Sequence, residues 1–365
     1  MRVTETFAQA REVLRNGALK EVIPGIDRFK AEDPTKVPVI FLDGEIHRRR
    51  RAAIARFFTP KAIATRYRAV MEECSNRLLH QMQAKGGGHL DRISFQLAVT
   101  VAATIVGLTN SDQAGLASRI KVTLASGLVQ KSHWAAKLVA ELIRRCHALN
   151  FFIRDVRPAI AARRKQRQED VISHLLDEGY SDTAILIECM TYAAAGMMTT
   201  REFIVMAAWH LFGNEALLQR FLTGDEADQF AILEEILRLE PIASVLHRHA
   251  DEDIELPEAG PIPADTVFAI DIRAANTDEE ATGPCPYAID PDRAKQMKGI
   301  GSFMSFGDGA HRCPGAQVAL HETRVFLDRL FRVPGIRLER EPDMRWCEEL
   351  TSYELRNAMI ACDRT

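Results

Sequence analysis

The stretch SFMSFGDGAHRCPGAQVALHETRVFLDRLF, from Ser302 to Phe331, decides how the rest of this chain is interpreted. A glycine-rich segment is followed by one cysteine, Cys313, and then by an amphipathic run that predicts a long helix. Gly307, Gly309 and Gly315 allow a tight loop with positive φ angles and a close approach of the backbone to a bulky group. The stretch therefore predicts a cysteine presented on a glycine-rich loop.

Cys313 lies just before the predicted helix, and Pro314 after it can open that helix because its φ is already fixed. Backbone N–H groups and the helix dipole at such an N-terminus favour a thiolate. A thiolate in a glycine-rich loop, with the aromatic Phe306 nearby, meets the requirement for an axial haem ligand. The alternatives are a small buried hydrophobic cysteine and half of a nucleotide-binding loop, which GDGAHR fits poorly because its third glycine is missing.

The run F-G-D-G-A-H-R-C-P-G resembles the haem-binding loop of the cytochrome P-450 family. The resemblance implies that the chain binds haem b and that Cys313 is the ligand of the iron. The positions that match the family's loop are Phe306, Gly307, Gly309, His311, Cys313 and Gly315.

Composition is that of an ordinary globular protein. The 365 residues are 47% hydrophobic and 27% charged, with a net charge of −3, which indicates no nucleic-acid partner. The N-terminal stretch has neither a signal-peptide core nor a membrane anchor. Seven cysteines without a CxxC pair indicate reduced thiols. We expect a cytoplasmic monomer, and the resemblance implies a protein of bacterial type that folds as a single domain over residues 1–365.

Apolar residues at three- and four-residue steps predict a mainly α protein with a minor β component. Gly86, Gly87 and Gly88 predict a turn between helices, and the basic run 163–167 predicts a solvated helix end. The helical segments are Phe7–Leu14, Ala52–Leu79, Ile93–Val106, Leu116–Phe152, Ala184–Phe212 and Gln229–Leu239, and the strands are Thr266–Ile272, Val333–Leu338 and Ala358–Cys362.

The resemblance extends over most of the chain and implies the cytochrome P-450 fold. That fold is a helix-rich triangular prism with the haem between a distal helix and the proximal cysteine loop. The N-terminal helix and first strand that family members often carry before Val3 are expected to be short or absent.

Basic residues far from the cysteine loop match the family's partners for the two haem propionates. His47 and Arg51 are four apart, share a helical face, and match the family's H-x-x-x-R motif. By the same resemblance, Arg248 and His311 are further propionate partners. Two buried carboxylates must be paired or hydrogen-bonded, which gives the physical need for such a set. Taken alone, the His47–Arg51 pair would indicate only a surface coincidence.

The distal helix is predicted to begin after Ser181, a good N-cap, and has almost no bulk at its centre. Close helix packing would explain the small residues equally well. The segment also resembles the family pattern small-Gly-x-acid-Thr-Thr, which implies room for dioxygen and a threonine that helps deliver protons. The matching residues are Ala195, Gly196, Thr199 and Thr200, whereas Met198 occupies the position of the acid.

The pair Glu235 and Arg238 matches the family's buried E-x-x-R ion pair. The spacing alone is weak evidence, because E-x-x-R also occurs at Glu12, Glu45 and Glu141. The resemblance also implies a substrate pocket, whose candidate residues are Thr191, Ala194, Met198, Ile242, Ala243 and Val245.

The resemblance implies a monooxygenase that oxidises an apolar small molecule. Electrons would come from a separate ferredoxin or flavodoxin, and arginines near the proximal face would form its basic docking surface. A peroxygenase that uses hydrogen peroxide and a non-catalytic haem-containing ligand-binding protein are the alternatives. The arginines are Arg48, Arg49, Arg50, Arg56 and Arg312.

Overall fold

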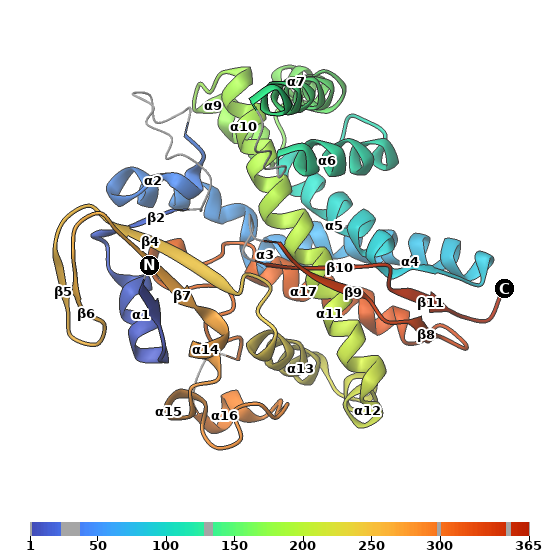
Figure 1. The fold of residues 1–365 in the computed structure, drawn as a ribbon. Coiled ribbons are helices and arrows are strands. Elements are labelled where there is room, and N and C mark those ends of the chain that lie inside the picture. The colour runs from blue at the N-terminus through green and yellow to red at the C-terminus, as the bar shows by residue number, and fades with distance from the viewer. Residues whose placement is uncertain (1, 23–36, 128–133, 298–300, 348–351, 365) are drawn as a thin grey trace.

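The structure is a computed structural model that describes residues 2–22, 37–127, 134–297, 301–347 and 352–364. Helices dominate these ranges (Figure 1), and none of them is long and apolar enough to cross a membrane. The α-helices are α1 Phe7–Arg15, α2 Gly44–Ala55, α3 Pro60–Ala62, α4 Arg68–Lys85, α5 Leu90–Val106, α6 Gln113–Gly127, α7 Trp134–Phe151, α8 Arg157–Lys165, α9 Val171–Asp177, α10 Asp182–Tyr192, α11 Thr199–Gly213, α12 Glu215–Thr223, α13 Glu226–Leu239, α14 Ile272–Asn276, α15 Glu279–Thr282, α16 Arg293–Met297 and α17 Ala316–Leu330.

The strands form small sheets at the edges of the helical body. One sheet has the order β1-β7-β4-β2, with β1 parallel to β7 and the other pairs antiparallel. A second has the order β3-β11-β8, and β9–β10 and β5–β6 are antiparallel pairs. The strands are β1 Arg2–Thr4, β2 Leu19–Glu21, β3 Gly87–His89, β4 Val245–Ala250, β5 Ile254–Leu256, β6 Gly260–Ile262, β7 Thr266–Asp271, β8 Arg337–Arg340, β9 Asp343–Cys347, β10 Ser352–Arg356 and β11 Met359–Ala361.

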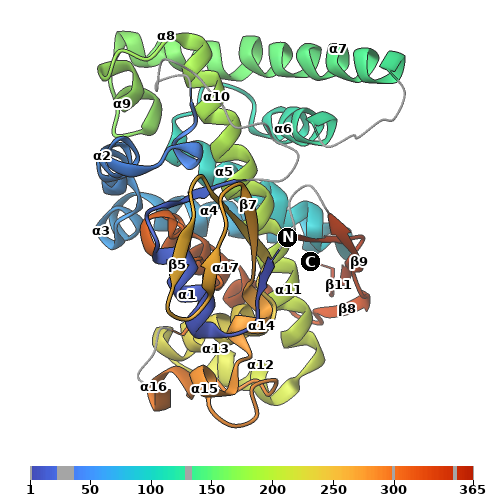
Figure 2. The same cartoon turned by 60° about the vertical axis from the view of Figure 1, so that its left-hand side comes forward.

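The rod formed by α10 and α11 runs through the middle of the molecule (Figures 1 and 2). A π-helical turn, η6 Ala193–Met198, joins the two helices. Helix α11 is buried on nearly every side from Thr200 to Ala208, and it packs on α5 and α17 in the main core. A smaller core lies between α1 and the β1-β7-β4-β2 sheet. The sheet thus sits beside the helical body, at the end where the cysteine loop lies.

The structure confirms the periodicity prediction for α1, α5, the α10–α11 rod and α13. The predicted helix Ala52–Leu79 is interrupted, because Thr59 is extended and Pro60 begins a new helix. Between Pro60 and α4 the chain passes through the π turn η4 Ile63–Tyr67. The segment Leu116–Phe152 forms two helices, α6 and α7, and residues 128–133 between them lie outside the described ranges.

Of the predicted strands, Thr266–Ile272 and Ala358–Cys362 are confirmed as β7 and β11. Val333–Leu338 is wrong for its first half, since the chain still turns after α17 there and β8 begins at Arg337. The glycine turn is also only partly right. Gly86 ends α4 in a left-handed conformation, but Gly87 is in strand β3, where a Cβ atom would approach a backbone oxygen of β11 to 2.4 Å.

The basic run 163–167 is not uniformly solvated. Arg163 is only 2% exposed, and its guanidinium binds Asp170 at 2.5 Å, Asn110 at 2.7 Å and Thr109 at 2.9 Å. This arginine therefore belongs to the interior, where it joins α8 to the start of α9.

Candidate active site

Cys313 lies in a loop that closes on itself before α17. Its backbone N–H donates to the carbonyl of Phe306 at 2.8 Å, and Gly315 is the N-cap of α17. Burial raises the pKa of the Cys313 thiol, while N–H groups of Gly315 and Ala316 and the charge of Arg51 act in the opposite direction. The loop therefore stabilises the thiolate form of Cys313 in part, and a bound cation would complete that stabilisation.

Two glycines of this loop have the left-handed conformation that the sequence predicts. Gly307 has φ +69° and Gly309 has φ +67°, and a Cβ atom on Gly309 would come within 2.5 Å of the carbonyl oxygen of Leu14. Gly309 is therefore needed for packing against the end of α1. The expectation of a positive φ is wrong for Gly315, whose φ is −84° because it already enters the helix.

Helix α2 brings His47 and Arg51 against this loop. The guanidinium of Arg51 donates to the carbonyl of Arg312, and the His47 ring stacks on the His311 ring with centroids 4.0 Å apart. The charge of Arg51 also acts on both Cys313 and Tyr192, at the end of α10. Three segments that are distant in sequence therefore meet at one place: α2, the cysteine loop and the distal rod.

His47 is buried in this cluster, and its pKa is lowered to about 4. Burial is the main cause, and the nearby His311 and Arg51 add to it. The ring is consequently neutral near pH 7. It could donate a single N–H to a carboxylate, but it adds no positive charge to the cluster.

Arg248 reaches the same cluster from strand β4, already paired with a carboxylate. It lies opposite Glu21 in the antiparallel β2–β4 register, and the two side chains form a buried ion pair. His311 contacts both Glu21, at 3.9 Å, and Asp43, at 3.3 Å. Burial raises the pKa of Glu21, whereas Arg248 and His311 oppose that shift. Nothing in the sequence analysis singled out these two carboxylates.

The middle of the distal rod is open on one side. Ala195 is exposed although it lies at the centre of a mostly buried rod, and Gly196 has only Ala102 within 4 Å of a built Cβ position. The Thr199 hydroxyl donates to the carbonyl of Ala195 at 2.6 Å, and Thr200 donates to Gly196 at 2.7 Å. The π turn η6 widens the helix at this place, as π turns often do at functional sites.

The acid missing from position 198 is not replaced by Glu202. The carboxylate of Glu202 accepts from Arg201 at 2.5 Å, from Arg356 at 2.7 Å and from the backbone N–H of Leu355 at 2.7 Å. It is 3% exposed and therefore committed to joining α11 to strand β10. Met198 itself is half-buried.

The predicted pocket residues lie on two elements. Thr191, Ala194 and Met198 are half-buried on the distal rod, and the Thr191 hydroxyl is used within the helix, donating to Ile187 at 3.0 Å. Ile242, Ala243 and Val245 form the connection from α13 into β4, where Ile242 is buried and the other two are half-buried. This segment continues directly to Arg248.

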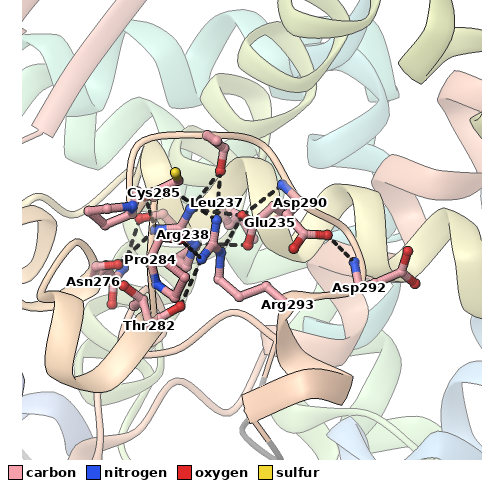
Figure 3. Close-up of polar contacts among 12 residues, drawn as sticks. Glu235, Leu237, Arg238, Asn276, Thr282, Pro284, Cys285, Asp290, Asp292 and Arg293 are labelled. Atoms are coloured by element: carbon pink, nitrogen blue, oxygen red, sulfur yellow. Dashed lines mark hydrogen bonds and ion pairs between the residues drawn. The ribbon is translucent and has the colours of Figure 1, made fainter.

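The Glu235–Arg238 pair is buried, and it lies in a cluster of polar contacts that includes Asn276 (Figure 3). Arg238 binds the carboxylate of Glu235 at 2.7 Å and the carbonyls of Asn276, Pro286 and Ala288. Sequence reasoning assigned no role to the third member, Arg293.

Arg293 is 4% exposed and completes this network. It binds Glu235 at 3.0 Å and donates to four carbonyls of the loop between α15 and α16. The network (Glu235, Arg238 and Arg293) therefore holds an irregular loop whose carbonyls have no strand or helix to satisfy them.

The proposed docking arginines are not equivalent. Arg50 is excluded from the exposed set, because its guanidinium binds the buried Glu188 and the carbonyl of Val37. Arg48 is exposed but pairs with Glu45 at 2.7 Å. Arg49 and Arg56 are exposed on α2 and just after it, and Arg312 is half-buried in the loop that α2 contacts.

The sequence of this chain is similar to a known protein family and to individual members of it. The sequence profile of the cytochrome P-450 family matches residues 230–338, which contain the Glu235 network and the cysteine loop. Cytochrome P-450 107B1 of Saccharopolyspora erythraea is 25% identical over 94% of this chain and 81% of its own length. Pentalenic acid synthase of Streptomyces avermitilis is 28% identical over 87% of this chain and 75% of its own length.

Solved structures show the same fold. The crystal structure of CalO2 superposes with a TM-score of 0.82 at 23% identity, covering 99% of this chain and 90% of its own. P450BioI, crystallised with an acyl carrier protein ligated to hexadec-9Z-enoic acid, gives a TM-score of 0.80 at 23% identity, covering 99% of this chain and 91% of its own.

Proposed function

Because the chain belongs to the cytochrome P-450 family of haem-dependent monooxygenases, we propose that it oxidises an apolar small molecule with electrons from a separate protein. The observation that carries this proposal is the open place at Ala195 on the distal rod. The same rod carries Thr199 and also Tyr192, which the charge of Arg51 affects as it affects Cys313. Members of this family bind haem b, and the residues present fit that group.

The fit rests on the chemistry of the donor set. Cys313 supplies a sulfur backed by N–H groups of its own loop and by arginine charge, as a thiolate ligand of iron requires. His47, Arg51, His311 and Arg248 supply donors for two propionates. Arg248 and His311 also face Glu21 and Asp43, so we propose that the protein's carboxylates and the propionates share these donors.

When bound, the haem supplies the oxygen-activating redox chemistry, and the protein supplies ligation, shape and proton movement. Cys313 would donate electron density to the iron. Ala195 and Gly196 have little side-chain bulk and therefore leave space beside the rod. Thr199 keeps a hydroxyl at the edge of that space, where its oxygen can accept from a water molecule while its hydrogen is held by Ala195.

The substrate is proposed to be apolar and small enough to lie against the rod. Ala194, Met198, Ile242, Ala243 and Val245 offer no charge, and the proposed wall residue Thr191 has its hydroxyl satisfied within its own helix. Such a wall selects by apolar contact and shape. The proposal includes a cytoplasmic location, where reduced donor proteins are available.

Thr199→Ala is expected to lower the product formed per reducing equivalent by on the order of ten-fold or more, with a matching rise in released hydrogen peroxide. The reason is that Thr199 is the proton-carrying side chain beside Ala195, while Met198 cannot carry a proton and Glu202 is engaged elsewhere. Product, peroxide and NADH consumption, measured with a reconstituted donor system, give the coupling ratio.

Thr200→Ala is the matched control, since Thr200 is buried and donates to Gly196 in the same manner. Met198→Asp is expected to speed proton-dependent turnover by restoring an acid next to Thr199. Coupling that is unchanged in Thr199→Ala and reduced in Thr200→Ala would contradict this assignment of the proton carrier.

The electron donor is proposed to dock where α2 meets the cysteine loop, with Arg49, Arg56 and Arg312 as its basic contacts. Arg51 binding to the carbonyl of Arg312 places α2 against that loop. We expect the first-electron reduction rate to fall several-fold between low and physiological salt, because screening weakens exposed charge pairs.

Arg49→Ala and Arg56→Ala should each reduce that rate at low salt and flatten its salt dependence. Arg337→Ala is the control, because Arg337 is equally a surface arginine, 59% exposed, on the distant strand β8. Stopped-flow reduction by an acidic ferredoxin measures the rate. If Arg337→Ala has the same effect as the α2 variants, the docking surface is not at α2.

A second candidate function is supported by one observation, the methionine at position 198 with Glu202 committed to Arg201 and Arg356. If hydrogen peroxide is the oxidant, the site needs less proton delivery, and an acid at position 198 is less necessary. The peroxygenase proposal predicts that turnover with peroxide exceeds turnover with a ferredoxin system on the same substrate.

A further inference from the structure

Helix α7 carries an apolar stripe on its outward side. It forms the outer edge of the molecule in both views, where it lies over α6 (Figures 1 and 2). The stripe continues into the π turn η5 Phe152–Val156, and with Cys146, which is also exposed, it is called the α7 stripe below. Its large members and their exposed fractions are Leu138 62%, Val139 55%, Leu142 63%, Ile143 45%, Leu149 55% and Ile153 49%.

This concentration is not typical of the rest of the surface. Thirteen large hydrophobic side chains are exposed among the described residues, and six of them belong to the α7 stripe. The opposite side of the same segment faces inward, with Phe151 1% exposed and Asp155 fully buried. The stripe is therefore additional to the face that packs on the protein, and it needs a cover of its own.

The spacing of the stripe fits a helix as that cover. Val139, Leu142, Cys146, Leu149 and Ile153 follow one another at steps of three, four, three and four residues. This alternation is the a/d seam of a coiled coil, whose side chains fit between those of a facing helix. Leu138 and Ile143 flank the seam and widen it.

The area and the uncharged seam favour a second copy of α7 as the occupant. The stripe exposes roughly 500 Å² of apolar surface, so two copies would bury on the order of 1,000 Å², the lower size of a specific interface. No seam position carries a charge.

We propose that two copies of this protein pair through the α7 stripe, antiparallel and around a two-fold axis near Cys146. The contact is self-complementary, as a two-fold interface must be, and it brings Leu142 opposite the second copy's Ile153 and Cys146 opposite its Leu149. The proposal replaces the monomer expected from the sequence, and it is independent of the catalytic assignment.

The test is the mass of the haem-loaded protein in solution as a function of concentration. Analytical ultracentrifugation should show a species of twice the 40.9 kDa chain that dissociates on dilution. The double variant Leu142→Glu/Leu149→Glu should raise the dissociation constant about a hundred-fold or more, because four carboxylates would enter the seam. Both side chains are exposed in the single chain, so the haem absorbance spectrum should not change.

Met344→Glu/Trp346→Glu is the matched control, since these side chains are 47% and 40% exposed on strand β9. It should dimerise like the wild type. In a Cys285→Ser background, a short bismaleimide should join two chains through Cys146, and Cys146→Ser should abolish that product.

Three results would overturn the proposal. They are a wild type that stays monomeric at every concentration, a dimer that survives the two glutamates in the stripe, and a monomer that sediments with anionic phosphatidylglycerol vesicles only when the stripe is intact. The last result would assign the stripe to a lipid surface.

Discussion

Arg238→Ala is expected to remove about 3–5 kcal/mol of folding free energy, enough to leave little folded protein. Arg238 is 0% exposed, and within the described ranges it is the only charged side chain that binds both Glu235 oxygens, at 2.7 and 2.8 Å (Figure 3). Its loss would leave one Glu235 oxygen without its arginine and the carbonyls of Asn276 and Pro286 without this donor, whereas Ala288 would keep its bond from Arg293.

The chain offers a control with the same motif. Glu141 and Arg144 have the same spacing and a 2.7 Å ion pair, but their side chains are 36% and 46% exposed. Arg144→Ala should therefore cost less than about 1 kcal/mol. Urea unfolding followed by tryptophan fluorescence compares the two, and Arg238→Lys, which keeps the charge without the planar fork, should lie between them.

If Arg238→Ala and Arg144→Ala lower the free energy of unfolding equally, burial does not make the fold more dependent on the Glu235–Arg238 pair. If Arg238→Ala yields no soluble protein, the comparison passes to Arg238→Lys and Arg144→Lys, for which the same order is expected.

The Glu235–Arg238 and Glu141–Arg144 pairs also show what could not be predicted from the sequence alone. The spacing is the same in every E-x-x-R of this chain, and only the family resemblance singled out Glu235 and Arg238. What distinguishes the pair physically is the loop of residues 282–290, whose carbonyls surround Arg238 and Arg293. That loop has no periodic pattern, so no sequence feature indicated that Arg293 belongs to the network.

Long helices were predictable because their apolar residues recur at helical steps over several turns, as in α5 and α13. Strands such as β1 and β2 were missed because three residues are too few to show an alternation. The ion pair between Glu21 and Arg248 depends on the register of β2 with β4, and therefore could not be derived without the sheet. Arg163 was likewise predicted to be solvated, because the sequence does not show that Asp170 folds back to bind it.

Cys313→Ser is expected to abolish the thiolate signature of the haem protein and at least about 99% of its monooxygenase activity. In the wild type, carbon monoxide added to the reduced protein should produce the strongly red-shifted Soret band of a thiolate adduct. The reason lies in the loop: burial alone would keep the thiol neutral, but N–H groups of Gly315 and Ala316 and the charge of Arg51 favour the anion. Iron binding then completes the deprotonation.

Serine preserves the size of the side chain and the loop bond from the residue 313 N–H to Phe306, so the fold should survive, as far-ultraviolet circular dichroism would show. A hydroxyl in the same place remains protonated and donates far less electron density.

Cys285→Ser is the control, since Cys285 is an exposed thiol remote from this loop and should leave the spectrum unchanged. A red-shifted carbon monoxide band that persists in Cys313→Ser would mean that another thiol binds the iron. A wild-type spectrum typical of histidine ligation would instead point to an imidazole as the ligand, with His311 the nearest ring in sequence to the loop cysteine.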